Sequence, residues 1–531
     1  MAGKLKPKMS AGPDHISTKI LKLIIPIIIN PICHLFNLSL QTGFIPTQLK
    51  TAKVVPVYKS DDRHNFTNYR PISLLSSLSK LLEKIVARQI IGFLHKHKIL
   101  YKHQYGFRGG HSTEHPVIHF LEKIFQSLNK KKSEFTLGIF LDLKKAFDTV
   151  DHQILLSKMA HYGFRGLSNL WFKNYLGGRI QFTSINGENS NPKPMICGVP
   201  QGSVLGPLLF LIFINDLPQA TNFFTLLFAD DTTFQIAHSD TQPLFDLARI
   251  ELSKAATWFQ TNKLTLNVSK TKYILFRSKS MKVNFENLNL TIGEEKVERI
   301  GTDCKKKFFK FVGHHLDEFL TWEHQINHVQ GKLASANYAI SCSKNFLPKQ
   351  IRLTLYNSLF RSHLDFGILS WGCAPESKLK KIITLQKKCL RNVACKSYRS
   401  HTDPIFSSLK VLKFNDLFKS NCSVFMHKIF NNKQPESFQG MFPVLPGTDI
   451  GSRTNNFQLD KLKNSGMSHF PAATLPRIWN ALKPEIKHIE SRNSFQNQLV
   501  KSIYGFNNMD IIIDTYPSTV HCHDDYCPDC N

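Results

Sequence analysis

The pattern of apolar and polar residues predicts several helices and strands in the first half of the chain. From Ser79 to Leu100 large apolar residues recur at the spacing of one helix face: Leu81, Leu82, Ile85, Val86, Ile90 and Phe93. A loop is expected from Tyr101 to Ser112 and a second helix from Glu114 to Asn129. Leu137 to Leu141 is short and apolar throughout, which is typical of a buried strand, and the chain is expected to turn helical after Asp142.

A glycine- and proline-rich turn, Gly198 to Pro207, leads into the segment Leu208 to Asp216, which is apolar on every side. This predicts a loop that opens a buried helix, where backbone groups can approach a ligand closely. The turn lacks the Lys-Ser/Thr ending of a Walker loop, so ATP hydrolysis is not indicated. Farther on, Ala255 to Asn262 is expected to end a helix and Tyr273 to Phe276 to form a strand.

The segment Leu21 to Leu40 is the one stretch apolar enough to resemble a membrane span. Pro26 and Pro31 interrupt it, and Lys22 and His34 lie within it. We therefore predict a pair of buried amphipathic helices here, and no association with a membrane.

Composition and charge narrow the class of protein. The 531 residues with 42% hydrophobic content can bury several cores, and the length predicts about three domains or subdomains. The formal net charge of +29 favours an acidic partner, of which nucleic acid is the commonest, although such charge also occurs simply for solubility. Most of the eleven cysteines are scattered singly, which is typical of a reduced intracellular protein.

Beyond Lys305 the chain becomes basic, and we expect it to be helical. Phe308, Phe309 and Phe311 alternate there with Lys305, Lys306, Lys307 and Lys310. Aromatic residues among lysines suit a track for nucleic acid, but a strand with one solvated face explains the pattern equally well.

Acidic residues at the ends of apolar strands carry the strongest chemical signal. Of three Asp-Asp pairs, Asp61-Asp62 and Asp524-Asp525 lie in polar surroundings, whereas Asp230-Asp231 interrupts two apolar, β-prone runs. Two acids at the tip of a hairpin, beside Asp142 from a neighbouring strand, could bind two Mg²⁺ ions roughly 4 Å apart. This is the layout of a two-metal nucleotidyl-transfer site, because buried acids are costly unless they hold a cation.

Seven segments, in order, resemble the reverse transcriptases of non-LTR, LINE-type retrotransposons, most closely the jockey and CR1-like groups. The first two resemble fingers blocks and the other five resemble motifs A to E: Asn68–Leu75, Gln104–Thr113, Phe140–Asp148, Gly198–Pro207, Phe228–Asp231, Leu266–Lys272 and Phe311–Asp317. Together they cover roughly residues 10 to 320. Motif E departs from the family pattern at His314 and His315, and Leu475 to Leu482 resembles a recurring C-terminal segment without a role that we can derive.

The resemblance implies an α+β fold, a right-hand polymerase with fingers, a palm built on an antiparallel sheet, and a thumb, followed by a mostly helical C-terminal region. We expect fingers and palm in residues 1–320, a helical thumb-like region in 321–420 and a C-terminal region with a Cys/His-rich tail in 421–531. Fewer than seventy residues precede the first fingers block, so we do not expect the endonuclease that usually comes before the polymerase in these elements.

The implied activity is RNA-directed DNA synthesis, in which dNTPs extend a primer 3′-hydroxyl along an RNA template. By the resemblance, Asp142, Asp230 and Asp231 would hold the two Mg²⁺ ions, and Lys270 would protonate the leaving pyrophosphate, with Lys272 as the alternative. Asp148 and Asp151 are expected to cap or support rather than to bind metal.

Four more residues receive roles at the nucleotide. Arg70 would neutralise the triphosphate, and Gln201 and Gly202 would lie against the incoming nucleotide and the template. Phe147 would block a ribose 2′-hydroxyl and so select deoxynucleotides, unless it is simply a core residue of its helix. A Phe at this position disfavours an RNA-dependent RNA polymerase.

The partners implied are an RNA template, a DNA primer or nicked target DNA, and dNTPs, which places the protein inside the cell, in cytoplasm and nucleus. The alternative is a catalytically idle remnant that only binds RNA. At the C-terminus, Cys522, Cys527 and Cys530 with His521 or His523 could bind Zn²⁺, although the irregular spacing favours a disordered tail. The sequence does not determine the oligomeric state.

Overall fold

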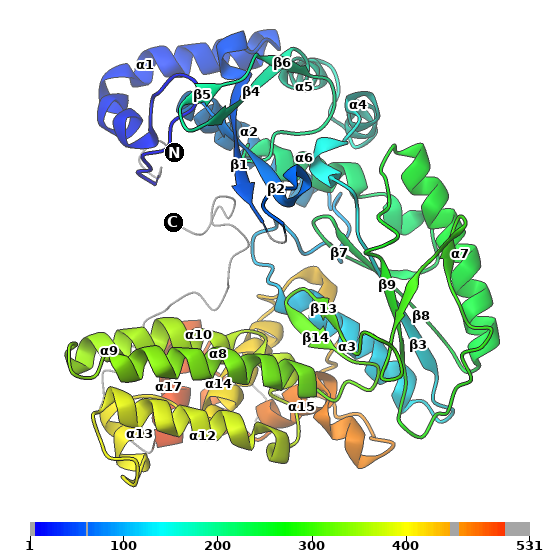
Figure 1. Ribbon diagram of the computed structural model, residues 1–531, viewed down its shortest axis with the longest axis vertical. Coiled ribbons are helices and arrows are strands. Elements are labelled where there is room, and N and C mark those ends of the chain that lie inside the picture. Colours follow the sequence, from blue (N-terminus) through cyan, green and yellow to red (C-terminus); the bar gives the residue numbers. More distant parts are fainter. Residues whose placement is uncertain (1–5, 60–61, 446–455, 505–531) are drawn as a thin grey trace.

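The computed structural model describes residues 6–59, 62–445 and 456–504. It has a mixed α/β fold in which two larger sheets and their helices form one part and a set of helices forms another (Figure 1). Helices of the first part are α1 (Thr18–Thr42), α2 (Ser77–Lys96), α3 (Glu114–Asn129), α4 (His152–His161), α5 (Leu167–Leu176), α6 (Leu205–Ile214) and α7 (Thr241–Thr261). The predicted helices that became α2 and α3, and the helix end near residue 262, are confirmed.

A five-stranded sheet lies at the centre of the first part. Its strand order is β12-β9-β3-β8-β7, and its members are β3 (Phe135–Leu141), β7 (Phe224–Phe228), β8 (Asp231–His238), β9 (Lys272–Phe276) and β12 (Glu298–Ile300). β8 and β9 flank β3 on both edges in antiparallel register, and α3 and α7 pack against it, so all seven of its residues are buried. The strands predicted at Leu137–Leu141 and Tyr273–Phe276 are confirmed, and Asp142 directly follows β3.

A second sheet lies on the side of α1 and α5 (Figure 1). β1 pairs antiparallel with β2 and parallel with β4, and two short strands extend β4. The strands are β1 (Thr51–Tyr58), β2 (Tyr69–Leu75), β4 (Arg179–Ile185), β5 (Glu188–Asn189) and β6 (Lys193–Met195). Small two-stranded ribbons, separate from both sheets, are formed by β10 (Thr291–Ile292) with β11 (Glu295–Lys296) and by β13 (Phe309–Phe311) with β14 (His314–Leu316).

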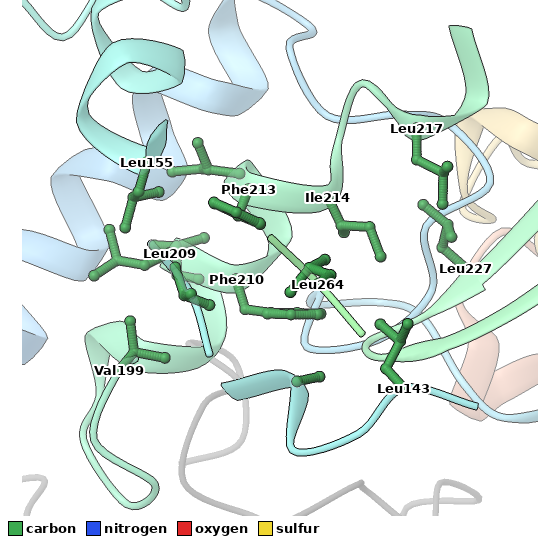
Figure 2. Packing of buried hydrophobic residues seen from close by; sticks show 14 of the residues in the cluster. Leu143, Leu155, Val199, Leu209, Phe210, Phe213, Ile214, Leu217, Leu227 and Leu264 are labelled. Carbon is green, nitrogen blue, oxygen red and sulfur yellow. The ribbon is translucent and has the colours of Figure 1, made fainter. Parts of the chain in front are cut away.

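The helix predicted after the glycine- and proline-rich turn is α6, and every one of its ten residues is buried. Leu209, Phe210 and Phe213 pack in a cluster that also contains residues from β7 and from the segments that follow β3 and α7 (Figure 2). A helix that is apolar on all sides needs such burial all round. α6 therefore fixes the turn before it against the central sheet.

The prediction of a pair of buried amphipathic helices over Leu21 to Leu40 was wrong. This segment belongs to one continuous helix, α1, which contains both Pro26 and Pro31, and only part of one face is buried. Leu23 is 73% exposed and Ile27 is 82% exposed. α1 is the one helix of the described residues that is long and apolar enough to cross a membrane, by length and composition alone.

The expectation of a helix directly beyond Lys305 was also wrong, because β13 and β14 come first and α8 begins only at Glu323. Within β13, Phe311 is buried while Lys310 is exposed, so this strand has one packed face and one solvated face. The strand explanation for the alternating phenylalanines and lysines is thus confirmed; whether this face also contacts nucleic acid stays a prediction.

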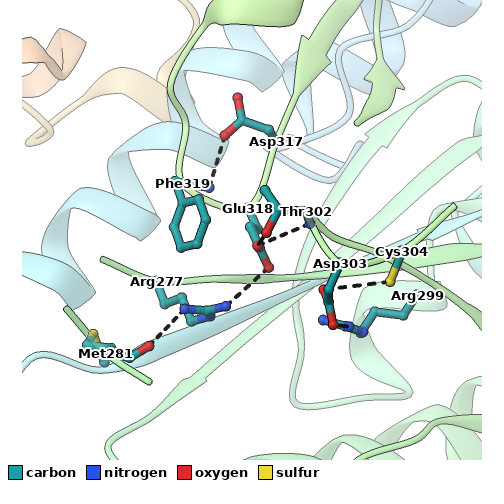
Figure 3. A network of polar contacts seen from close by, with 9 residues as sticks. All are labelled: Arg277, Met281, Arg299, Thr302, Asp303, Cys304, Asp317, Glu318 and Phe319. Atoms are coloured by element: carbon teal, nitrogen blue, oxygen red, sulfur yellow. Dashed lines mark hydrogen bonds and ion pairs between the residues drawn. The ribbon is translucent and has the colours of Figure 1, made fainter. Parts of the chain in front are cut away.

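A polar network connects the central sheet with the chain that leads into α8 (Figure 3). The backbone N–H of Arg277 donates to the carbonyl of Glu318 at 3.2 Å, and its guanidinium Nη2 lies 3.5 Å from the buried Glu318 carboxylate. The N–H of Thr302 donates to the same carboxylate at 3.2 Å. This buried acid therefore has a cation and hydrogen-bond donors around it.

The rest of the described chain is mainly helical and packs around a second core (Figure 1). Its helices are α8 (Glu323–Cys342), α9 (Lys349–Leu355), α10 (Ser362–Asp365), α11 (Ile368–Trp371), α12 (Glu376–Val393), α13 (Asp403–Leu409), α14 (Phe414–Phe430), α15 (Pro471–Asn480), α16 (Pro484–Lys487) and α17 (Arg492–Tyr504). α8 and α12 pack side by side, and α15 contacts α3 of the first part.

Candidate active site

Asp142 is held at the end of β3 by Asn267, which lies between α7 and β9. The Asn267 backbone N–H donates to the Asp142 carbonyl at 2.8 Å, and the Asn267 side-chain Nδ2 donates to Asp142 Oδ2 at 2.8 Å. Asn267 belongs to the segment that resembles motif D. Two bonds from one residue therefore fix both the backbone and the carboxylate of Asp142.

Asp230 and Asp231 lie at a tight turn between β7 and β8, as predicted. Phe228 pairs with Asp231, so Ala229 and Asp230 are the two central residues of the turn. β8 also pairs with β3, with Leu141 opposite Thr232. This register brings Asp231 and Asp142 to neighbouring strand ends.

The three carboxylates influence one another. The pKa of Asp231 is raised to about 7, first by the protein that crowds its carboxylate and then by the negative charges of Asp230 and Asp142. The residue nevertheless keeps an exposed surface, so a ligand could reach it. The pKa of Asp230 is also raised, by burial and by Asp142, against the opposing positive charges of Lys59 and Arg70.

Among residues 6–59, 62–445 and 456–504, no group of three or more His, Cys, Asp or Glu side chains is gathered closely enough to hold a metal ion. The aspartates thus converge without forming a closed cage. Their chemistry still fits a hard divalent cation, because carboxylate oxygens are the ligands Mg²⁺ prefers and like charges that raise each other's pKa are relieved by a cation. The predicted two-ion geometry stays a prediction.

Gln201 and Gly202 lie against β2. The backbone N–H of Ser73 donates to the Gln201 carbonyl at 2.6 Å. Gly202 has φ +116°, and a Cβ there would lie 2.6 Å from the Ser73 carbonyl oxygen. The close approach that this glycine permits is therefore to another part of the chain; its predicted contact with a nucleotide is untested.

Asp148 and Asp151 have supporting roles, as expected. Gln201 Nε2 donates to Asp148 Oδ1 at 2.8 Å. Asp151 caps α4, since its Oδ1 accepts from the backbone N–H groups of Gln153 and Ile154, both at 3.0 Å. Asp62 is exposed, as expected for a solvated loop, whereas Asp61, Asp524 and Asp525 lie outside the described residues.

Arg70 and Phe147 differ in their surroundings. Arg70 is exposed on β2, and its positive charge acts on Asp230. Phe147 is half-buried; its ring centroid lies 4.7 Å from that of Phe210 and 6.3 Å from that of Phe107. One side of Phe147 therefore packs on α6, which leaves both of its predicted roles open.

The two candidate lysines of motif D differ in burial and in their contacts. Lys272 is buried in β9, where its Nζ lies 2.8 Å from Glu298 Oε2 and also donates to the Ser269 carbonyl. Lys270 is exposed. Because Lys272 is committed to an ion pair, Lys270 is the better candidate for a proton donor.

Sequence reasoning missed Glu83, which lies on the buried face of α2. Its Oε2 accepts from the backbone N–H groups of Val204 and Leu205 at 2.5 and 3.3 Å, at the start of α6, and its Oε1 accepts from the Tyr175 hydroxyl at 3.0 Å. Burial raises the pKa of Glu83, while these donors oppose the rise. The available signal was a single acid among the small and apolar residues of the buried face of α2.

Two further predictions concern His314 in the segment that resembles motif E and the Cys/His-rich tail. His314 is buried and stacks on Phe366, with ring centroids 5.3 Å apart, so the departure in motif E has a packing role. The Cys/His tail, residues 521–531, lies outside the described residues, and its predicted Zn²⁺ site stays a prediction.

A mixed α/β fold that brings acids from adjacent strand ends to one turn fits the layout expected for a polymerase of the nucleotidyl-transfer class. Residues 57–316 match the family described as "Reverse transcriptase (RNA-dependent DNA polymerase)". Residues 57–316 therefore belong to this family, whose members generally depend on Mg²⁺.

Curated relatives confirm the resemblance to non-LTR elements. The chain is 27% identical over 450 residues to the "RNA-directed DNA polymerase from mobile element jockey" of Drosophila melanogaster, which covers 82% of this chain and 47% of that protein. It is 28% identical to the "Probable RNA-directed DNA polymerase from transposon BS" (73% and 43% covered) and to that from "transposon X-element" (72% and 41%), both from the same fly. The chain thus spans slightly less than half the length of these relatives.

Proposed function

We propose that this protein is the RNA-directed DNA polymerase of a non-LTR retrotransposon, which adds dNTPs to a primer 3′-hydroxyl along an RNA template. The observation that carries the proposal is the turn at Asp230 and Asp231 beside Asp142, inside a region that matches the reverse-transcriptase family. The negative charges of these acids raise the pKa values of Asp230 and Asp231, which opposes folding and favours a use outside folding.

The proposed layout is a right hand. The central sheet with α3 and α7 would be the palm, the sheet of β1, β2 and β4 with α1 and α2 the fingers, and the helices from α8 the thumb. This keeps fingers and palm in 1–320, the thumb in 321–420 and a C-terminal region in 421–531. The support is the position of the acids on the central sheet and the set of helices from α8 onward, whose core is shared with α3 and with one side of the central sheet (Figure 1).

Asp142, Asp230 and Asp231 would hold two Mg²⁺ ions, which supply activation of the primer hydroxyl and neutralisation of the triphosphate. Asn267 would keep the Asp142 carboxylate in place. Lys270 would protonate the pyrophosphate, a role that its exposed ammonium permits. Arg70 would bind the triphosphate from the edge of β2.

Substrate choice would depend on residues near the turn. Phe147 would exclude the 2′-hydroxyl of a ribonucleotide through the part of its ring that Phe210 leaves uncovered. Gln201 and Gly202 would line the site for the nucleotide and template. The Asp148 contact to Gln201 supports this arrangement, because it holds the glutamine side chain in one orientation.

The proposed partners are an RNA template, a DNA primer or nicked target DNA, and dNTPs. The net charge of +29 supports contact with nucleic acid. The activity would be intracellular, with RNA bound in the cytoplasm and priming in the nucleus.

The test is primer extension by purified protein on a primed RNA template with Mg²⁺, with dNTPs and rNTPs in separate reactions and Asp230→Asn as the control. DNA synthesis that disappears in the variant supports the proposal. A folded protein that binds RNA but makes no DNA would instead indicate the idle remnant.

A further inference from the structure

A segment from the second fingers-like block lies along the free edge of β7. The Tyr105 N–H donates to the Leu227 carbonyl at 2.8 Å, and the Leu227 N–H donates to the His103 carbonyl at 3.0 Å. Gln104 and Leu227 thereby form a parallel bridge. The central sheet is extended by this segment just before the turn that carries Asp230.

The side chain of Gln104 reaches that turn. Gln104 is 1% exposed, and its Oε1 accepts from the backbone N–H of Gly106 at 2.9 Å and from that of Ala229 at 3.1 Å. Its Nε2 is buried and has no hydrogen-bond partner among the described residues. The Gln104 side chain therefore makes its hydrogen bonds only through its oxygen among the described residues.

Ala229 needs this acceptor. It has φ +57°, in the left-handed region that an alanine adopts only at a cost, and it is 5% exposed. A buried N–H that cannot reach water requires a partner in the protein. Oε1 of Gln104 supplies it one residue before Asp230.

Backbone contact reinforces the arrangement. A Cβ on Gly106 would lie 2.3 Å from the Ala229 nitrogen, so the chain after Gln104 is pressed directly on the turn. On the other side of the segment, the Tyr105 hydroxyl lies 3.0 Å from His103 Nδ1 and 3.1 Å from His119 Nδ1. His119 Nε2 in turn lies 2.9 Å from the Ser437 carbonyl. The segment that carries Gln104 is therefore anchored on both sides.

We propose that Gln104 is a positioning residue of the active site: its side-chain oxygen fixes the Ala229 amide and thereby directs the carboxylates of Asp230 and Asp231 toward Asp142. Gln104 does not touch the reacting atoms in this proposal. The inference rests on the proposed function for its catalytic meaning, whereas its structural part, an ordered turn, can be measured without activity.

The test compares Gln104→Met, which removes the acceptor at similar size, with the matched variant Gln235→Met. Gln235 is also a buried glutamine of the central sheet, 2% exposed on β8, and its Nε2 donates to the Phe120 carbonyl at 3.2 Å, away from the turn. Both variants lose one buried amide. Only Gln104→Met loses the bond to Ala229.

The first readout is amide hydrogen exchange of the peptide that spans residues 226–232, measured without metal. We expect exchange to be at least about tenfold faster in Gln104→Met than in the wild type, and nearly unchanged in Gln235→Met. Equal exchange in the two variants would overturn the proposal. Because no synthesis is involved, this result is independent of whether the protein proves to be a polymerase.

The second readout is primer extension, for a wild type that is active. We expect Gln104→Met to lower kcat by about tenfold or more and to raise the Mg²⁺ concentration for half-maximal rate, with the Kd for primed RNA unchanged. Gln104→Glu keeps an acceptor oxygen and should retain more of the order at the turn than Gln104→Met does. If Gln104→Met does not fold, Gln104→Asn replaces it in both measurements. The asparagine side chain is one methylene group shorter, so its oxygen does not reach the N–H groups of Gly106 and Ala229. A kcat and a Mg²⁺ requirement equal to those of Gln235→Met would contradict the proposal.

Discussion

The turn at Asp230 and the helical region from α8 treat charged groups in opposite ways. At the turn, three carboxylates repel one another, and the pKa of Asp231 is raised to about 7 by crowding and by its two neighbours. In the helical region the buried Arg352 donates to the carbonyls of Val393 and Lys344 at 3.0 and 3.1 Å and also to that of Leu347. The turn leaves like charges together, whereas the buried Arg352 donates to three carbonyl acceptors.

This difference separates groups that serve a ligand from groups that serve the fold. Like charges that are held close together cost folding free energy, so their presence indicates a use outside folding. The Arg352 guanidinium joins the last carbonyl of α12 to two carbonyls of the loop between α8 and α9, and the α12 carbonyl has no partner within its own helix. Substitutions in the two regions should therefore have opposite effects on activity and stability.

The largest expected effect is the loss of activity in Asp230→Asn. We expect DNA synthesis to fall by at least about 10³-fold, because one metal ligand and its charge are removed. The free energy of unfolding at pH 7 without metal should stay the same or rise by up to about 1 kcal/mol, because repulsion among the acids is reduced. Primer extension and urea denaturation in EDTA measure the two quantities. If Asp230→Asn still made DNA, or if it were destabilised by more than about 1 kcal/mol, the acids at the turn would not differ from groups that serve the fold.

The next effect belongs to the helical region. Arg352→Met should lower the free energy of unfolding by about 3 kcal/mol, because three carbonyls lose their donor in a buried place. The control is Arg361→Met, which loses a half-exposed pair with Asp365 at 3.3 Å. Urea denaturation would measure both variants, and their activity per folded molecule should be close to that of the wild type. If Arg352→Met changed kcat rather than the free energy of unfolding, Arg352 would serve activity and not only the stability of the helical region.

A third substitution asks whether a lone buried acid is costly even away from the turn. Burial raises the pKa of Glu122 on α3 to about 7, although Gln126 Nε2 donates to it at 2.9 Å. Since the folded pKa exceeds the ordinary value of 4.5, the folded state holds the proton more tightly, and stability is lost as the pH rises from about 4.5 to 7.

Glu122→Gln should remove this pH dependence. The variant should match the wild type near pH 4.5 and exceed it by about 2 kcal/mol at pH 8. Denaturation curves at several pH values test the difference, with Glu134→Gln, whose side chain pairs with Lys130, as the control. A wild type that is more stable than Glu122→Gln at pH 8 would show that the carboxylate has a partner when ionised.

Local patterns sufficed where burial and periodicity agree. The limits of α3 and the position of Asp142 after β3 were predictable. Both α3 and β3 are rich in apolar residues, and polar residues flank them. The turn at Asp230 could be predicted for the same reason. α1 could not, since its apolar pattern is that of a buried segment while most of its surface is exposed.

Contacts between distant segments were beyond local reasoning. Gln104 stood within a segment that resembles the family, but its bond to Ala229 joins residues 125 positions apart. The pairing of Lys272 with Glu298 likewise depends on the parallel pairing of β9 with β12. Sequence could name Lys270 and Lys272 as candidates, and only the fold distinguishes them.

Lys270 and Lys272 should therefore respond differently to substitution, with effects smaller than those above. Lys270→Met should lower kcat by about tenfold, less than the hundredfold usual for a general acid, because water can replace an exposed donor. Lys272→Met should instead lower stability, since Glu298 would lose its buried partner. Single-turnover extension and thermal denaturation of both variants separate the roles. If Lys272→Met had the slower chemistry at normal stability, the assignment would be reversed.

The smallest expected effect is that of Phe147→Ala, because Phe147 shares features of both regions. Its ring packs on Phe210, like a scaffold residue, yet it is half-buried beside the site. If its open side excludes the 2′-hydroxyl, truncation should reduce the preference for dNTPs over rNTPs by about fivefold, with some loss of stability. Phe210→Leu disturbs the same stack from a fully buried position and should lose stability alone. Competition between dNTPs and rNTPs measures the preference, and an equal loss of stability with unchanged preference in both variants would make Phe147 a core residue only.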